Sequence, residues 1–315
     1  MMGGIALVFP GQGSQSVGMG RELAAAFDVA AEIYSRASEL IGQDIARLSF
    51  EGPGERLART EYAQLALYVN SMAALAVARE AGLAGDVVSG HSLGEYSALA
   101  AANAINFEDG LRLVMRRGEV MAQAAAERPG AMAAIIGLDD SKVEEICARS
   151  GEVWPVNYNC PGQLVISGES ASVTRAQDAA AAAGAKKTVR LAVGGSFHSP
   201  LMRSAAGRMK EELAEVKIKD PDPPMLSPTS CEYETAGGLK DMLVVQMVSP
   251  VRWRQAVERL IADGVDGFIE VGNGKVLSTL VRRINRDVQT ANISDLQSLE
   301  KTLALRMTKD PGEAI

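Results

Sequence analysis

A serine nucleophile is the chemistry to which the residue types of this sequence point first. The segment Gly90-His91-Ser92-Leu93-Gly94-Glu95 follows a short apolar run at 87–89 and precedes an Ala-rich stretch at 96–102. A strand, then Gly-x-Ser-x-Gly, then a helix is typical of a nucleophile elbow, a sharp turn that exposes the serine hydroxyl at a helix N-terminus. Free N–H groups and the helix dipole favour a developing oxyanion there. A Gly-rich surface turn is the simpler alternative.

Only His91 and His198 offer an imidazole base for such a serine, because the chain has two histidines. His91 adjoins Ser92, and neighbouring residues at a strand-to-helix turn point apart, so it is poorly placed to take the serine proton. His198 follows a predicted strand and precedes a predicted helix, and loops at strand carboxyl ends are where α/β active sites form. We therefore predict His198 as the base, against the simpler interpretation of a solvated or capping residue. No His/Cys/Asp cluster has metal-ligand spacing, so no metal is expected.

Composition excludes several other classes of protein. The net charge of −7 argues against general nucleic-acid binding. No apolar run approaches the roughly 18 residues of a membrane span. The residues before the apolar run Ile5–Phe9 have no basic segment or cleavage signal, so no targeting peptide is expected. The three cysteines are widely spaced and lack a Cys-x-x-Cys motif, which fits a reducing compartment. We expect a cytoplasmic protein with no nucleic-acid or membrane partner.

The elements that would position these residues alternate between strand and helix at both ends of the chain. Continuous apolar runs at Ile5–Phe9, Val87–Ser89 and Val265–Val271 are typical of buried parallel strands. A further short strand is predicted near Pro224–Ser227. Helical patterns are predicted at 20–27, 29–41, 61–80, 107–127, 200–215, 239–247, 253–263 and 275–285.

The middle of the chain has a β-α-β-β-α-β order, which is the ferredoxin-like arrangement. We therefore predict an α/β fold: a doubly wound, mostly parallel domain formed by 1–127 and 193–302, with a ferredoxin-like α+β subdomain inserted at 128–192. The tail at 303–315 is polar and is expected to fray. The predicted strands of the insert are 131–137, 153–158, 163–167 and 187–191, and its helices are 141–149 and 172–183.

Four motifs in order along the chain resemble those of the malonyl-CoA:acyl carrier protein transacylases of fatty acid synthesis. The resemblance runs from about Ile5 to Ile293 and implies a hydrolase-like α/β domain with an inserted ferredoxin-like subdomain. The motifs are Phe9-Pro10-Gly11-Gln12-Gly13-Ser14-Gln15, Gly90-His91-Ser92-Leu93-Gly94-Glu95, Phe197-His198-Ser199-Pro200-Leu201-Met202 and Glu270-Val271-Gly272-Asn273-Gly274-Lys275-Val276-Leu277.

The resemblance implies the catalytic roles residue by residue. Ser92 would take the acyl group from coenzyme A as an ester, and His198 would act as general base and then general acid. The main-chain N–H groups of Gln12 and Leu93 would form the oxyanion hole. The main-chain carbonyl of Gln246 would orient His198, in place of the acidic third member of an esterase triad.

The resemblance also implies substrate contacts. Arg117 corresponds to the family's carboxylate-binding arginine, and a guanidinium binds a carboxylate such as that of a malonyl group through two parallel hydrogen bonds. Arg116 is expected on a solvated face. His91 and Asn159 are expected at the substrate site, with a turn asparagine as the simpler alternative for Asn159. Phe197 is expected to narrow the acyl pocket against branched groups, with a core aromatic as its alternative.

One further role is expected, and the chain departs from the family pattern at two positions. Gln64 is expected to support the Gln12 loop or to be a buried amide. Asn273 stands where the family often has proline, and Asn103 replaces a frequent glycine.

The function implied is a ping-pong acyltransferase that moves malonyl from coenzyme A, a substrate rather than a cofactor, to the phosphopantetheine thiol of an acyl carrier protein. No cofactor is expected. Alternatives are a discrete acyltransferase of a polyketide pathway, a serine esterase or thioesterase, and a non-catalytic carrier-binding scaffold. Docking of an acidic carrier needs a basic patch, for which the candidates are Arg282, Arg283 and Arg286 on the last predicted helix and Lys186, Lys187 and Arg190 on the insert.

Overall fold

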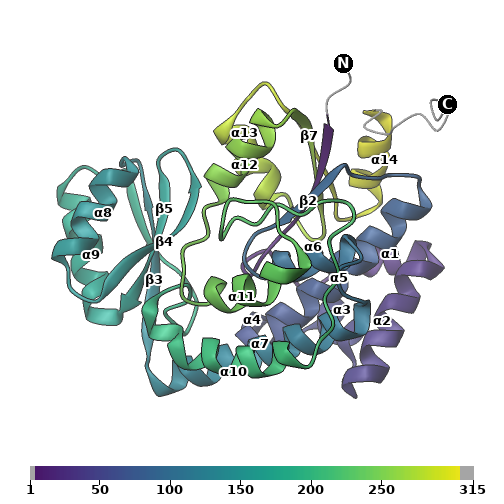
Figure 1. Ribbon diagram of the computed structural model, residues 1–315, viewed down its shortest axis with the longest axis horizontal. Coiled ribbons are helices and arrows are strands. Elements are labelled where there is room, and N and C mark those ends of the chain that lie inside the picture. The colour runs from purple at the N-terminus through teal and green to yellow at the C-terminus, as the bar shows by residue number, and fades with distance from the viewer. Residues whose placement is uncertain (1–3, 306–315) are drawn as a thin grey trace.

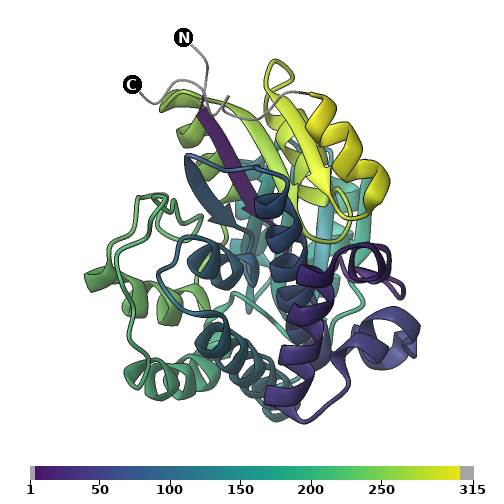
Figure 2. The ribbon, with the colours of Figure 1, turned by 90° about the vertical axis from the view of Figure 1, so that its right-hand side faces the viewer.

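The computed structural model describes residues 4–305, which form two separate sheets surrounded by helices (Figure 1). The first sheet is parallel, in the order β2-β1-β7-β8. Figure 2 shows its strands side by side in the upper part of the view. The apolar runs that predicted three of these strands are buried, as expected for a sheet covered on both faces. The strands are β1 (Gly4–Phe9), β2 (Val87–Gly90), β7 (Val265–Val271) and β8 (Gln289–Ile293).

The second sheet is antiparallel and has the order β4-β5-β3-β6, with two helices packed against it. This confirms the predicted β-α-β-β-α-β arrangement, which lies to the left in Figure 1. The domain boundaries at 127/128 and 192/193 stay a prediction. The elements are β3 (Gly130–Ile136), α8 (Asp140–Arg149), β4 (Val153–Cys160), β5 (Gln163–Glu169), α9 (Ser170–Ala182) and β6 (Lys187–Arg190).

Helix α5 is the central helix of the larger part. It is rich in alanine and buried on nearly every side, and it packs against α2 and α7. None of the helices within residues 4–305 combines the length and apolar character that a membrane span requires. The helices around the parallel sheet are α1 (Arg21–Ala26), α2 (Asp28–Ile41), α3 (Ile45–Glu51), α4 (Gly54–Ala58), α5 (Thr60–Glu80), α6 (Gly94–Ala101), α7 (Phe107–Glu127), α10 (Arg203–Ala214), α11 (Ala236–Gln246), α12 (Trp253–Ala262), α13 (Val276–Ile284) and α14 (Leu296–Ala304), with a 3-10 turn at Pro200–Met202.

The structure differs from the sequence-based prediction at the C-terminal end, in one loop, and at 45–58, where the short helices α3 and α4 were not predicted. Strand β8 was not predicted because its edge sequence, Gln-Thr-Ala-Asn-Ile, lacks a continuous apolar run. Helix α14 begins at a capping box formed by Asp295 and Ser298, so the predicted tail starts inside a helix. The remainder of that tail, 306–315, lies outside the described residues. The segment 224–227 forms two isolated bridges, Met225 with Val88 and Leu226 with Tyr233, in place of the predicted strand.

Candidate active site

Ser92 lies in a turn that only a glycine-flanked sequence can form. The turn joins β2 to α6, and Ser92 has a positive φ of 53°. A Cβ on Gly90 would lie 2.0 Å from the carbonyl carbon of Gly94, and a Cβ on Gly94 would lie 2.0 Å from the main-chain oxygen of Phe9. Because neither position has room for a side chain, this strained turn can hold the Ser92 hydroxyl at the N-terminal end of α6.

The Ser92 hydroxyl is hydrogen-bonded to His198, which comes from a loop 106 positions later in the chain. Ser92 Oγ lies 2.7 Å from His198 Nε2, and His198 Nδ1 lies 2.9 Å from the main-chain oxygen of Gln246, at the end of α11. A carbonyl oxygen only accepts, so this contact assigns the proton to Nδ1 and leaves Nε2 able to accept the proton of Ser92.

The environment of His198 keeps its imidazole neutral. Burial, and next the positive charge of Arg117, lower the pKa of His198 to about 3, although the hydrogen bond to the Gln246 carbonyl acts in the opposite direction. The ring therefore stays unprotonated as the pH falls below the ordinary histidine value of 6.5. The unprotonated ring is the form that can act as a base.

We expect the reactivity of Ser92 to survive mild acidification. With His198 unprotonated, the rate at which a small neutral sulfonyl fluoride modifies Ser92 should change less than about twofold between about pH 7 and pH 5. Intact mass measures the modification, and circular dichroism at each pH controls for unfolding. A rate that falls with an apparent pKa near 6.5 would contradict this assignment.

Arg117 is a buried guanidinium beside the Ser92 hydroxyl. It lies on α7, is 1% exposed, and its Nη2 is 3.2 Å from Ser92 Oγ. Its Nη1 donates to Gln64 Oε1 at 2.6 Å, and its Nη2 donates to Gln246 Oε1 at 2.9 Å. The adjacent Arg116 instead pairs with two surface glutamates, as its predicted solvated face implies. A buried positive charge at this place is suited to an acyl group that carries a carboxylate.

The Gln12 loop lies directly against the Ser92 turn. A Cβ on Gly11 would be 2.4 Å from the main-chain oxygen of His91. Within residues 4–305, no protein acceptor takes the main-chain N–H of Gln12 or of Leu93. Both N–H groups are therefore unused within the described residues, and their role as an oxyanion hole for Ser92 stays a prediction.

Two side chains support this loop. Gln12 Nε2 donates to Thr60 Oγ1 at 3.3 Å, and Asn273 Nδ2 donates to a main-chain oxygen of the loop at 2.5 Å. Gln64 contacts Arg117 instead, so the prediction that it supports the Gln12 loop is wrong, and its alternative of a buried amide holds. Thr60 and Gln64 lie one turn apart on α5, and only the residue at the start of the helix reaches the loop.

The remaining predicted substrate residues lie on both sides of the site. His91 Nε2 is 3.0 Å from Asn159 Oδ1 on β4, and its ring lies 5.8 Å from that of Trp253. Burial lowers the pKa of His91. Phe197 is buried in the main core cluster, where its ring packs close to Gly195. Contacts of these residues with substrate stay a prediction.

A buried carboxyl completes the cluster: Glu95 ends the Gly90–Glu95 motif, but no role was predicted for it. Glu95 is fully buried and accepts hydrogen bonds from the hydroxyls of Ser227 and Thr229 and from Gln246 Nε2. Burial raises the pKa of Glu95 to about 7, against the lowering effect of these donors and of Arg117. Its position in the first turn of the helix that follows the elbow is the sequence signal that could have identified it.

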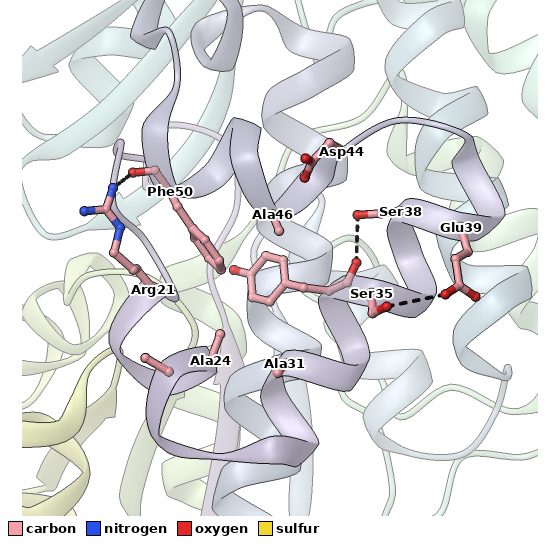
Figure 3. Close-up of a pocket in the computed structure, with 11 residues that line it drawn as sticks. Arg21, Ala24, Ala31, Ser35, Ser38, Glu39, Asp44, Ala46 and Phe50 are labelled. Carbon is pink, nitrogen blue, oxygen red and sulfur yellow. Dashed lines mark hydrogen bonds between the residues drawn. The ribbon is translucent and has the colours of Figure 1, made fainter.

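A surface pocket elsewhere in the molecule belongs to the N-terminal helices and not to this site. Figure 3 shows it between α1, α2 and α3, where the Ser38 hydroxyl donates to the main-chain oxygen of Tyr34 at 2.8 Å and Arg21 donates to the main-chain oxygen of Phe50. No residue of the Ser92 cluster lines it. In the part of the chain that the structure describes, no group of His, Cys, Asp and Glu side chains is arranged to hold a metal ion.

Comparisons with known proteins agree with this geometry. The acyl transferase domain family matches residues 6–309. The malonyl CoA-acyl carrier protein transacylase of Bacillus subtilis is 43% identical, with 99% of each chain covered. A crystal structure of an acyl carrier protein S-malonyltransferase from Vibrio cholerae is 42% identical, with a TM-score of 0.91 and coverage of 95% of this chain and 99% of that one.

A third similar protein was solved together with a partner. It is a malonyl-transacylase in complex with its type II PKS acyl-carrier protein; the match is 40% identical, with a TM-score of 0.93, and covers 96% of this chain and all of that one. The family match and these identities extend over nearly the whole chain. The chain therefore belongs to the malonyl-CoA:acyl carrier protein transacylase family of acyltransferases.

Proposed function

We propose that this protein transfers a malonyl group from coenzyme A to the phosphopantetheine thiol of an acyl carrier protein, through a malonyl ester on Ser92. The observation that carries the proposal is the buried Arg117 guanidinium 3.2 Å from a serine hydroxyl that is bonded to a neutral histidine. A hydrolase needs only the serine and the histidine, whereas the guanidinium supports an acyl group with its own carboxylate.

In the first half-reaction, Ser92 Oγ attacks the thioester carbonyl while His198 Nε2 takes the hydroxyl proton. The carbonyl oxygen becomes an oxyanion, which the N–H groups of Gln12 and Leu93 stabilise. The C–S bond then breaks, the proton on His198 passes to the leaving thiolate, and the malonyl ester of Ser92 remains. Arg117 holds the malonyl carboxylate throughout.

In the second half-reaction, the carrier thiol replaces coenzyme A. His198 takes the thiol proton, the thiolate attacks the Ser92 ester, and the serine oxygen leaves and recovers the proton from His198. Nucleophile, base and carboxylate-binding group are all side chains, so we propose that the reaction uses no cofactor.

We propose fatty acid synthesis as the process that this transfer feeds, as the sequence motifs imply. A polyketide pathway is the second candidate, which the similarity to the transacylase of a type II PKS acyl-carrier protein favours.

A cytoplasmic location is supported by Cys147, Cys160 and Cys231, whose thiols are all free.

To test the function, the protein is mixed with malonyl-CoA and a holo acyl carrier protein, and the mass of the carrier is measured by mass spectrometry. We expect a malonyl group on the carrier and ping-pong kinetics, and no transfer to a carrier without its phosphopantetheine arm. Steady release of malonate with an unmodified carrier would instead favour the thioesterase.

Carrier docking is expected to depend on one of the two basic patches. The side chains of both are exposed, but Arg283 Nη1 already donates to Gln163 Oε1 and Arg190 Nη1 to Thr174 Oγ1.

Reversing the charges of Arg282, Arg283 and Arg286 should lower kcat/KM for the carrier by at least about tenfold at low salt, because steering by charge is lost. Ser92 acylation by malonyl-CoA, measured alone, should be unchanged. The matched variant reverses Lys186, Lys187 and Arg190. If carrier transfer survives the first reversal, the carrier does not dock on Arg282 and Arg283 of α13 and Arg286 just after it.

A further inference from the structure

The proposed mechanism assigns no role to Glu95, a buried ionisable group of the site. Glu95 lies three residues after Ser92 in the first turn of α6 and is fully buried. Among residues 4–305, three side chains donate hydrogen bonds to it: Ser227 through Oγ, Gln246 through Nε2, and Thr229 through Oγ1 at 3.2 Å. These donors stabilise the ionised form of the carboxyl group, in opposition to the burial that raises its pKa to about 7.

The contact with Gln246 determines which way the side-chain amide of that residue faces. Gln246 Nε2 donates both to Glu95 and to the main-chain oxygen of Ser92, the latter at 3.0 Å. This leaves Gln246 Oε1 to accept from Arg117 Nη2 at 2.9 Å. If the amide turned over, its NH₂ group would face a guanidinium that can only donate, and its oxygen would face a carboxylate that can only accept.

The orientation of this amide in turn affects Arg117. Two amide oxygens, from Gln64 and Gln246, hold the two terminal nitrogens of the guanidinium, while its Nε has no hydrogen-bond partner among residues 4–305. Loss of the Gln246 contact would leave Nη2 with only the longer contact to the Ser92 hydroxyl, at 3.2 Å. Recognition of a carboxylate by two parallel hydrogen bonds depends on the direction of the guanidinium plane.

We propose that Glu95 is a positioning residue: by accepting from Gln246 Nε2 it fixes the Gln246 amide, and through that amide it aims the Arg117 guanidinium at the carboxylate of the incoming acyl group. The inference deepens the proposed malonyl transfer and rests on it. Because acetyl has no carboxylate for Arg117, the effect of Glu95 should be much larger for malonyl than for acetyl.

The test compares Glu95→Ala, Glu95→Asp and Glu95→Gln by single-turnover acylation of Ser92 with malonyl-CoA and with acetyl-CoA. Alanine removes the acceptor, and aspartate keeps the charge but withdraws the oxygens by one methylene. Both should lower the malonyl rate at limiting substrate by about ten- to a hundredfold, mainly through weaker binding, and the acetyl rate by less than about threefold. Glutamine keeps an oxygen for Gln246 Nε2 and should restore malonyl acylation to within about fivefold of the wild type.

Two further variants separate positioning from a general structural role. In an Arg117→Ala background, Glu95→Ala should cause no additional malonyl-specific loss, because the two residues act through one interaction. Glu270 is a second fully buried glutamate, which accepts from the main-chain N–H groups of Leu277 and Ser278 in α13. Glu270→Gln should lower the thermal stability without changing the ratio of malonyl to acetyl acylation.

Equal losses for the two acyl groups in the Glu95 variants, or a malonyl-specific loss that persists without Arg117, would overturn the inference. Aspartate nearly preserves the volume and charge of the site, so Glu95→Asp decides the question if the alanine variant does not fold. A wild-type protein that forms no malonyl ester would refute the proposed function instead, so the two failures are distinguishable.

Discussion

Replacing His198 by alanine should lower the rate of malonyl transfer by about 10⁴- to 10⁶-fold, as for loss of the base in other serine enzymes. The imidazole lies 2.7 Å from the Ser92 hydroxyl and is held in one orientation by the Gln246 carbonyl. Without it, no neutral base on the described residues contacts the hydroxyl, because the other partner of Ser92 Oγ is the Arg117 guanidinium. Single-turnover acylation by malonyl-CoA measures this loss directly.

The comparison for this variant is His91→Ala. His91 bonds to Asn159 and lies next to Ser92 in sequence without touching its hydroxyl, so we expect a loss of about tenfold or less. Thermal denaturation of both variants controls for unfolding. If His91→Ala proved as damaging as His198→Ala while folded, the assignment of the base would be wrong.

Replacing Arg117 by alanine should convert the site from one that selects malonyl into one that does not. A guanidinium can give a carboxylate two charge-assisted hydrogen bonds of about 1.5–3 kcal/mol each, so acylation by malonyl-CoA at limiting concentration should fall by about 10²- to 10⁴-fold. Acylation by acetyl-CoA should hardly change, because acetyl has no carboxylate for Arg117 to bind. The ratio of the two rates is the quantity to measure.

The chain provides a matched control in the adjacent position. Arg116 carries the same side chain but is half-exposed and paired with Glu119 and Glu212 at the surface. Exposed pairs contribute little to stability, so Arg116→Ala should leave both acylation rates near those of the wild type. A malonyl rate that survives Arg117→Ala would remove the main argument for a substrate with a carboxylate.

The sequence predicted those features that depend on neighbouring residues. The elbow was predictable because Gly90, Ser92 and Gly94 stand together in one short motif between an apolar run and a helical pattern. The buried strands were predictable because their apolar runs are continuous. The pairing of Ser92 with His198 followed from the shortage of histidines rather than from any knowledge of distance. The insert was predictable because its alternation of strands and helices falls within one stretch of chain.

Other features depend on contacts between residues far apart in the chain. Glu95 meets Gln246 across 151 positions, and Gln12 meets Thr60 across 48, and no local pattern encodes either pair. The role expected of Gln64 was wrong because one helical turn on α5 decides whether a side chain meets the Gln12 loop or Arg117. Strand β8 was missed because an edge strand needs no continuous apolar run.

The measurement that tests the central claim most directly is intact-protein mass spectrometry after brief mixing with malonyl-CoA, with acetyl-CoA and a Ser92→Ala variant in parallel. We predict a malonyl-sized increase in the mass of the wild type, much less modification by acetyl-CoA, and none in Ser92→Ala. An unmodified wild type that steadily hydrolyses the thioester, or a malonyl adduct that persists in Ser92→Ala, would contradict the account.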